Sequence, residues 1–213
     1  VYFGSYPQSE VTDSVTINKI ENALKISPIK GDTGADVWVD GVKYRRISKT
    51  DTNYDEYFDE VTNNGYRYFK WERIKWRVLN NNGSTLFVVA DKGLDCKCYN
   101  DEWIDVTWEN STLREWLNNS FYNTAFSANE QSAIIAQTVV NDDNTEYATE
   151  GGNNTTDKVY LLSIDEITNA TYGFCSNYST NSASRWIQPS NYARARGTYT
   201  YSDSSTGNND NCW

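Results

Sequence analysis

The sequence predicts an α+β fold in a single domain, residues 1–213, with a mainly antiparallel sheet and several short helices. Segments rich in β-branched and aromatic residues, joined by short turns, predict the sheet. Capped amphipathic segments between residues 107 and 131 predict helices. No linker, no repeat of fixed period and no long low-complexity tract divides the chain, so one domain is expected.

The N-terminal part predicts a strand, a helix and a hairpin in that order. VYFGSYPQ is typical of an edge strand. Apolar residues recur near helical spacing over residues 13–26, which predicts a short helix. Asp40-Gly41 lies between two β-rich arms and favours a type I′ turn. An acidic stretch with several tyrosines predicts a surface excursion near residues 30–65.

Residues 66–91 give the clearest strand signal. Apolar and charged side chains alternate through IKWRV, and the Asn-rich NNNG then turns the chain into LFVVA. LFVVA is a continuous apolar run, so it predicts a strand buried on both faces. VYLLS, residues 159–163, predicts a second short buried strand.

The stretch TWENSTLREWLNNSFYNTAFSANEQ, residues 107–131, predicts two short helices. Thr112 with Glu115 fits one capping box, and Ser127 with Glu130 fits another. SNYARARG predicts a last small helix, bracketed by Ser190 and Gly197. The inward positions of these elements predict one buried cluster, made of Trp76, Leu79, Phe87, Val89, Trp108, Leu113, Trp116, Leu117, Phe121, Leu161 and Leu162.

Composition excludes several classes of function. The net charge of −10 disfavours a nucleic-acid partner, which would require a basic face. No apolar run approaches the ~20 residues of a membrane-spanning helix. Histidine is absent, which excludes Ser-His-Asp and Cys-His catalysis and every histidine-ligated zinc site. The four cysteines form no CxxC pair, and both a long-range disulfide and free thiols remain open.

Six segments occur in one order: FGSYPQSE, IKWRVL, GLDCKCYN, TWENSTLREWLNNSFYNTAFS, GGNNTTDKVYLLSIDE and NYARARG. Together they resemble a family of domains in secreted or surface-anchored proteins of anaerobic, often gut-dwelling, bacteria. The resemblance implies an extracellular or cell-surface location. It also implies a C-type-lectin-like fold, in the branch that includes formylglycine-generating enzymes. Members of that family continue beyond the position of Trp213, so a further C-terminal segment is expected, and the start at Val1 leaves room for an upstream one.

The C-terminal region is rich in aromatic and amide side chains, which suit stacking and directional hydrogen bonds to a sugar or a protein. Core packing is the alternative, and it is the favoured interpretation for Trp186. The candidate ligand-binding residues are Tyr192, Tyr199, Tyr201, Asn208, Asn209, Asp210 and Trp213.

Oxygen-bearing side chains surround the loop at Gly151-Gly152, and hard oxygen ligands of this kind can hold calcium. The spacing is not that of an EF-hand loop. A cluster of turns in which the side chains bond their own backbone is the alternative. The candidate metal ligands are Asp142, Asp143, Asn144, Glu146 and Asp157, and calcium is the only cofactor that the sequence brings forward.

These observations favour a non-catalytic extracellular ligand-binding or adhesion domain of a bacterial surface protein, with a glycan or protein ligand. A carbohydrate-active hydrolase is one alternative, because Asp101/Glu102 and Asp165/Glu166 are carboxylate pairs. A cysteine-dependent oxidase, for which only Cys212 lies near the end, and a structural spacer are the others. The sequence leaves the oligomeric state open.

Overall fold

The computed structural model describes residues 1–53, 65–145, 147–198, 201–203 and 208–211. Contacts within the chain divide it into two compact units. Unit 1 comprises Val1–Cys96 and Ile164–Trp213, and unit 2 comprises Lys97–Ser163. The α+β class with a mainly antiparallel sheet and short helices is confirmed. The organisation as one domain stays a prediction.

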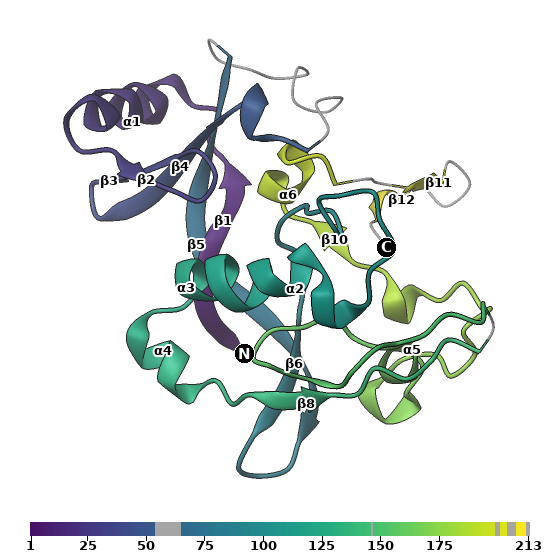
Figure 1. The fold of residues 1–213 in the computed structure, drawn as a ribbon. Helices are drawn as coiled ribbons and strands as arrows, with labels where there is room; N and C mark the ends of the chain where they lie inside the picture. Colours follow the sequence, from purple (N-terminus) through teal and green to yellow (C-terminus); the bar gives the residue numbers. More distant parts are fainter. Residues whose placement is uncertain (54–64, 146, 199–200, 204–207, 212–213) are drawn as a thin grey trace. The chain divides into compact units, whose positions relative to one another are not determined.

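Unit 1 is built on an antiparallel sheet in which the long strand β5 is central (Figure 1). The first part of β5 pairs with β1 on one side and β4 on the other, and its last part pairs with β6. The remaining strands follow in the order β4-β3-β2, so β2 forms the edge. The strands are β1 (Tyr2–Glu10), β2 (Ile29–Lys30), β3 (Ala35–Val39), β4 (Val42–Ser48), β5 (Tyr66–Asn81) and β6 (Leu86–Ala90).

Helix α1 (Ser14–Ile26) covers one face of this sheet, as the apolar spacing predicted. Asp13 caps its start by accepting the Thr16 N–H at 2.8 Å. Its buried side chains pack with side chains of β3 and β5, so helix and sheet share one core. The buried members of that core are Ile17, Ile20, Leu24, Val37 and Tyr68.

The predicted type I′ hairpin joins β3 to β4. Asp40 and Gly41 have φ values of 50° and 77°, and both central positions of a type I′ turn require positive φ. The register that follows pairs Val39 with Val42 and Trp38 with Lys43.

Several short elements complete unit 1. The helix predicted over SNYARARG is confirmed, since Ser190 caps it by accepting the Ala193 N–H and Gly197 follows it with φ 104°. Among the described strands, the short pair of β7 with β10 is parallel, whereas the other pairs are antiparallel. The elements are η1 (Lys49–Asp51), β7 (Lys92–Gly93), α5 (Ile164–Ile167), η4 (Ala170–Tyr172), η5 (Ala183–Arg185), β10 (Gln188–Pro189), α6 (Asn191–Ala195), β11 (Tyr201–Asp203) and β12 (Asn208–Asn211).

Unit 2 consists of short helices and one two-stranded ladder, β8 with β9. The first predicted capping box is wrong by one residue: Ser111, not Thr112, caps α2 by accepting the Arg114 N–H. The second box is confirmed, because Ser127 and Glu130 bond each other reciprocally. The elements are η2 (Trp108–Asn110), α2 (Thr112–Trp116), the π-helical η3 (Leu117–Phe121), α3 (Tyr122–Ala125), α4 (Ala128–Ala133), β8 (Gln137–Val139) and β9 (Thr155–Asp157).

The predicted core is only partly correct. Leu79, Trp108, Leu117 and Phe121 are buried, whereas Leu161 is 50% exposed. Trp76, Phe87, Val89, Leu113, Trp116 and Leu162 are half-buried, and so is Trp186. These residues belong to both units, and their forming one cluster stays a prediction.

Two strand predictions also need correction. β6 is half-buried or exposed instead of buried on both faces, since its one ladder is with the end of β5. Residues 159–163 form no strand. An apolar run alone therefore does not distinguish a sheet strand from a loop that packs on its neighbours.

Candidate functional site

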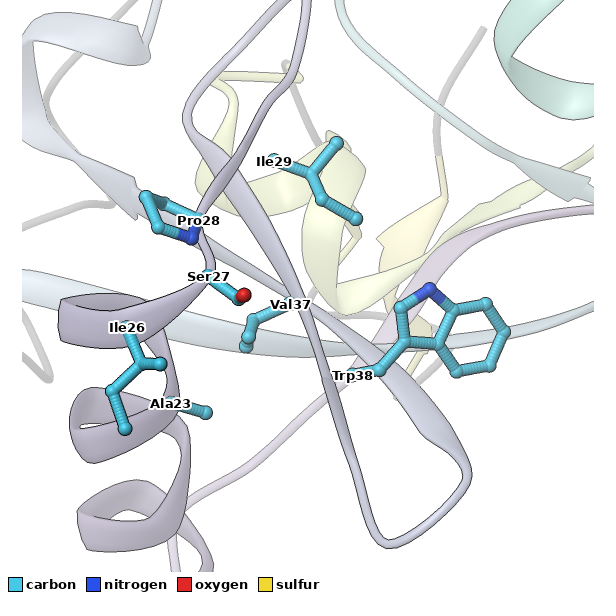
Figure 2. A pocket seen from close by; sticks show the side chains of 7 residues that line it. All are labelled: Ala23, Ile26, Ser27, Pro28, Ile29, Val37 and Trp38. Atoms are coloured by element: carbon cyan, nitrogen blue, oxygen red, sulfur yellow. The ribbon is translucent and has the colours of Figure 1, made fainter.

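A groove of about 520 Å³ opens at the edge of the unit 1 sheet (Figure 2). Its walls come from the end of α1, the segment that leaves it and strand β3. The lining residues are Ala23, Ile26, Ser27, Pro28, Ile29, Val37 and Trp38. Three of them expose large apolar side chains: Ile26 is 83% exposed, Ile29 45% and Trp38 58%.

The end of α1 shapes one side of the groove. The Ser27 N–H makes the last helical bond, to the Ala23 carbonyl at 2.9 Å, and Pro28 then prevents the helix from continuing. The chain turns directly into β2, so Ile26 and Ile29 flank the turn on the surface. The helix stop at Pro28 thus leaves the apolar side chains of Ile26 and Ile29 outside the core.

Strand β3 forms the other side and has an open edge. On that side β2 pairs only with Ala35 and Asp36, and no other strand in the described part of the chain pairs with Val37–Val39 there. In a two-residue hairpin the closing pair, here Val39 with Val42, exchanges hydrogen bonds. The alternation along the ladder then directs the backbone N–H and C=O of Trp38 away from β4, toward the open edge.

The groove is apolar inside and basic beside its walls. None of the lining side chains ionises, and the polar groups among them are the Ser27 hydroxyl and the indole N–H of Trp38. Lys25 precedes Ile26, Lys30 follows Ile29, and both lysines are exposed. The arrangement provides hydrophobic contact, an open backbone edge and positive charge, without a nucleophile–base pair.

A buried ionic network holds β3 and β4 behind the groove. Arg45 binds Asp36 through two bonds, Nε to Oδ1 at 2.7 Å and Nη2 to Oδ2 at 3.0 Å. Lys43 adds a contact to Asp36 at 3.1 Å while its amino group lies 3.5 Å from the centre of the Trp71 ring. Burial alone would lower the pKa of Arg45, but Asp36 and nearby tyrosines raise it, so the guanidinium stays charged.

Tyr192 belongs to this buried network and not to a ligand face. It is 0% exposed, and its hydroxyl accepts a bond from Arg45 Nη1 at 3.3 Å. Burial raises the pKa of Tyr192, and burial together with Asp95 raises that of Tyr6, whose hydroxyl donates to Asp95 at 2.6 Å. Asp95 also accepts from Arg196 at 2.9 Å. Tyr192 therefore has a structural role, because no ligand reaches its ring.

The other predicted ligand-binding residues fall in two groups. Tyr201 lies on β11, and Asn208, Asn209 and Asp210 lie on β12, which pair with each other. The backbone thus brings these four residues onto one short ladder. Tyr199 and Trp213 lie outside the described residues. The ligand face that these residues would form stays a prediction.

The loop predicted to bind calcium is tied together by its own hydrogen bonds. Asp143 Oδ1 accepts the Gly151 N–H at 3.0 Å, and Asn144 Oδ1 accepts the Tyr147 N–H at 3.3 Å. Asp142 and Asp143 are exposed, and Glu146 lies outside the described residues. Among the residues that the structure describes, no three acidic, cysteine or histidine side chains are grouped to hold a metal ion.

The Asp157 carboxylate accepts hydrogen bonds from protein side chains of unit 2. Its Oδ1 accepts from Arg114 Nε at 2.8 Å, and its Oδ2 accepts from Trp108 Nε1 at 3.0 Å and Thr155 Oγ1 at 2.6 Å. The carboxylate is 1% exposed, so the buried charge is balanced by Arg114. This arrangement holds β9 to the first helices of unit 2. It accounts for the burial of the Asp157 carboxylate without a metal ion.

None of the groups considered for catalysis is among the residues that line the groove. Asp101, Glu102 and Asp165 are exposed, and Glu166 is half-buried. Cys96, Cys98 and Cys175 are free thiols, and Cys212 lies outside the described residues. Burial raises the pKa of Cys96, which disfavours the reactive thiolate.

Sequence reasoning missed the groove. In the sequence, Trp38 fits a hairpin arm and Ile26 fits the end of a helix, so neither stands out. The available signal was the combination of Pro28 at the helix stop with large apolar residues just before and after it. Only the pairing of β2 with part of β3 shows that these residues face an open edge.

Fold and site define an α+β protein with an apolar groove at a sheet edge. The model of the family described as "Domain of unknown function (DUF6273)" matches residues 82–209, more than half of the chain. The chain therefore belongs to that family, and the groove lies in the segment that precedes the match. No curated protein and no solved structure gives a significant match. None of the helices described here is long and apolar enough to cross a bilayer.

Proposed function

We propose that this chain is a non-catalytic binding or adhesion domain of a bacterial surface protein, and that its groove takes an extended polypeptide segment. The observation that carries the proposal is the exposed apolar groove beside the open edge of β3. Large apolar side chains exposed together commonly mark a place where a partner binds.

The lining favours a peptide over a glycan. Sugars are held by several converging polar side chains in addition to aromatic faces, and the groove lining offers only the Ser27 hydroxyl and the Trp38 indole N–H. A peptide instead supplies its own backbone donors and acceptors. It can extend the sheet at Trp38, where the backbone groups point outward, and place alternate apolar side chains in the groove.

The exposed lysines determine which ligand charge the groove favours. Lys25 and Lys30 lie next to the two isoleucines of the groove, and the buried Asp36 is already neutralised by Arg45 and Lys43. An apolar peptide flanked by acidic residues therefore complements the site better than a basic one.

The location at the cell surface and a C-type-lectin-like fold for the chain belong to the same proposal. Their support is the ordered set of six sequence motifs. An experimental structure of the full protein, compared with C-type-lectin-like domains, tests the fold. Surface labelling of the source cells tests the location.

Selection from a random peptide library displayed on phage tests the peptide-binding function. Enriched peptides should combine apolar and acidic residues and should bind the wild-type chain. Trp38→Ala should weaken binding by about 30-fold or more, as for an aromatic hot spot. Tyr178→Ala is the matched control, because Tyr178 is a similarly exposed aromatic of unit 1 outside the groove.

Two results would overturn the proposal. One is an absence of enriched peptides on a chain that is folded by circular dichroism. The other is enrichment of peptides whose binding survives Trp38→Ala. Robust binding on a glycan array with no peptide binding would replace the peptide with a sugar.

A further inference from the structure

A loop in unit 2, residues 99–106, carries a fully exposed apolar tip. Trp103 is 104% exposed and Ile104 61%. We call this segment the tip loop. A fully exposed tryptophan is unusual, because this side chain is normally among the most buried in a protein.

Hydrogen bonds hold the tip loop in one shape. The Ile104 N–H donates to the Glu102 carbonyl at 2.9 Å, a γ-turn that places Trp103 at its centre. Asn100 Nδ2 donates to the same carbonyl at 2.9 Å, and Asn100 Oδ1 accepts the Thr112 N–H at 3.2 Å. The exposure of Trp103 is therefore built into the loop.

Further bonds tie the loop to the start of α2. The Asp101 N–H donates to Thr112 Oγ1 at 2.9 Å, and the Leu113 N–H donates to the Tyr99 carbonyl at 3.2 Å. Because the loop is organised in advance, a partner that binds it has little ordering entropy to overcome.

Acidic side chains surround the tip. Asp101, Glu102 and Asp105 are exposed, and the Asp101 carboxylate lies 3.9 Å from the Lys97 amino group. The tip thus presents an apolar pair within an acidic stretch, DEWID. This is the chemistry that the groove of unit 1 selects: apolar side chains flanked by negative charge.

We infer that the tip loop of one copy of this chain occupies the groove of a second copy. The inference rests on the proposed function, since it names one occupant of the same groove. The indole of Trp103 enters the apolar groove beside Trp38, and the tip carboxylates lie near Lys25 and Lys30. The groove, about 520 Å³, has room for an indole.

This contact is heterologous, because it joins two different surfaces of identical chains. It leaves one free tip and one free groove in every pair, so assembly continues into rings or open chains. For a surface protein, such assembly would link neighbouring molecules.

Sedimentation velocity over a range of concentrations tests the inference. The wild-type chain should assemble as concentration rises, and Trp103→Ala and Trp38→Ala should each weaken assembly by about 30-fold or more. An equimolar mixture of the two variants should form a complex of two chains and nothing larger, because each supplies the half that the other lacks. Both substitutions are at exposed positions, so the fold should persist, as circular dichroism can verify.

Two controls sharpen the test. Tyr147→Ala in unit 2 and Tyr178→Ala in unit 1 remove exposed aromatics outside both surfaces and should leave assembly unchanged. A variant with Asp101→Asn, Glu102→Gln and Asp105→Asn should assemble more weakly and lose the dependence on salt.

Library peptides separate this inference from the proposed function. A library peptide that binds the groove should compete with assembly. Library peptides that bind the groove, together with a wild-type chain that stays monomeric, would overturn the inference and leave the proposed function standing. Assembly that needs Trp103 but not Trp38 would also overturn it.

Discussion

The guanidinium of Arg45 and the carboxylate of Asp36 form a two-point ion pair whose side chains are only 1% and 3% exposed. The pair lies across β3 and β4 at directly opposed positions. It immobilises the strand that carries Trp38, two residues beyond Asp36 and on the same face. The shape of the groove wall therefore depends on this pair.

Replacing Asp36 by Asn should destabilise the fold by about 3–5 kcal/mol, because Arg45 is then buried without its counter-charge. Urea unfolding measures the loss. The double variant Asp36→Asn with Arg45→Met should be at least about 1 kcal/mol more stable than the sum of the two single changes predicts. Strict additivity would show that the two side chains do not act as a pair.

Alkaline pH should unfold unit 1. Burial raises the pKa of Tyr6 and Tyr192 in the folded state, so the unfolded chain loses these protons first. Their contribution is fully present below about pH 10, the pKa of an unfolded tyrosine, and is lost as pH rises toward the folded values. Each of the two phenols can lower the free energy of unfolding by as much as about 1.4 kcal/mol for each pH unit in this range.

Denaturant titrations at a series of alkaline pH values measure this slope. Tyr192→Phe should reduce this slope, because phenylalanine has no phenol proton and only Tyr6 of the pair then titrates. An unchanged slope in Tyr192→Phe would indicate that other groups control alkaline unfolding.

Two glycines with similar backbone angles should respond differently to alanine. Gly41 has φ +77° and open space around its missing Cβ, so Gly41→Ala should cost only the backbone term of about 1–2 kcal/mol. Gly34 has φ +68°, but a Cβ there would lie 2.2 Å from the Arg46 carbonyl oxygen. Gly34→Ala should cost clearly more in urea unfolding, and equal losses would contradict the packing described for β4.

Asp157→Asn tests the structural role of that carboxylate against the calcium hypothesis. The change removes the charge that balances Arg114, so the melting temperature should fall. The fall should be the same with calcium and with chelator, since the structure commits Asp157 to protein donors. Stabilisation of the wild type by calcium that disappears in Asp157→Asn would support a metal site instead.

Local rules predicted much of the fold. The helix at Ser14–Ile26, the turn at Asp40-Gly41 and the cap at Ser127 each depend on residues close in sequence, where a few backbone angles decide the outcome. Burial was harder to predict. LFVVA has the composition of a central strand, but its exposure depends on which strands pair with it.

The candidate site was the least predictable part. Tyr192 resembled a ligand-binding aromatic, yet Arg45, far from it in sequence, draws it into the core. The groove depends on β2 being too short to cover all of β3, a property of pairing that no local pattern encodes. Oxygen-bearing neighbours near Gly151-Gly152 suggest calcium at Asp157, whereas its partners Arg114 and Trp108 are more than 40 residues away in sequence and no local pattern reveals them.

The central claim is that a peptide occupies the groove and pairs with the open edge of β3. Amide hydrogen exchange at Trp38, measured by NMR, tests it most directly. With the best library peptide at ten times its Kd, exchange at the Trp38 N–H should slow by about tenfold, because only the free fraction exchanges. The Gly83 N–H, which bonds Asn81 in the exposed turn after β5, should be unaffected. Saturating peptide that leaves exchange at Trp38 unchanged would contradict the account.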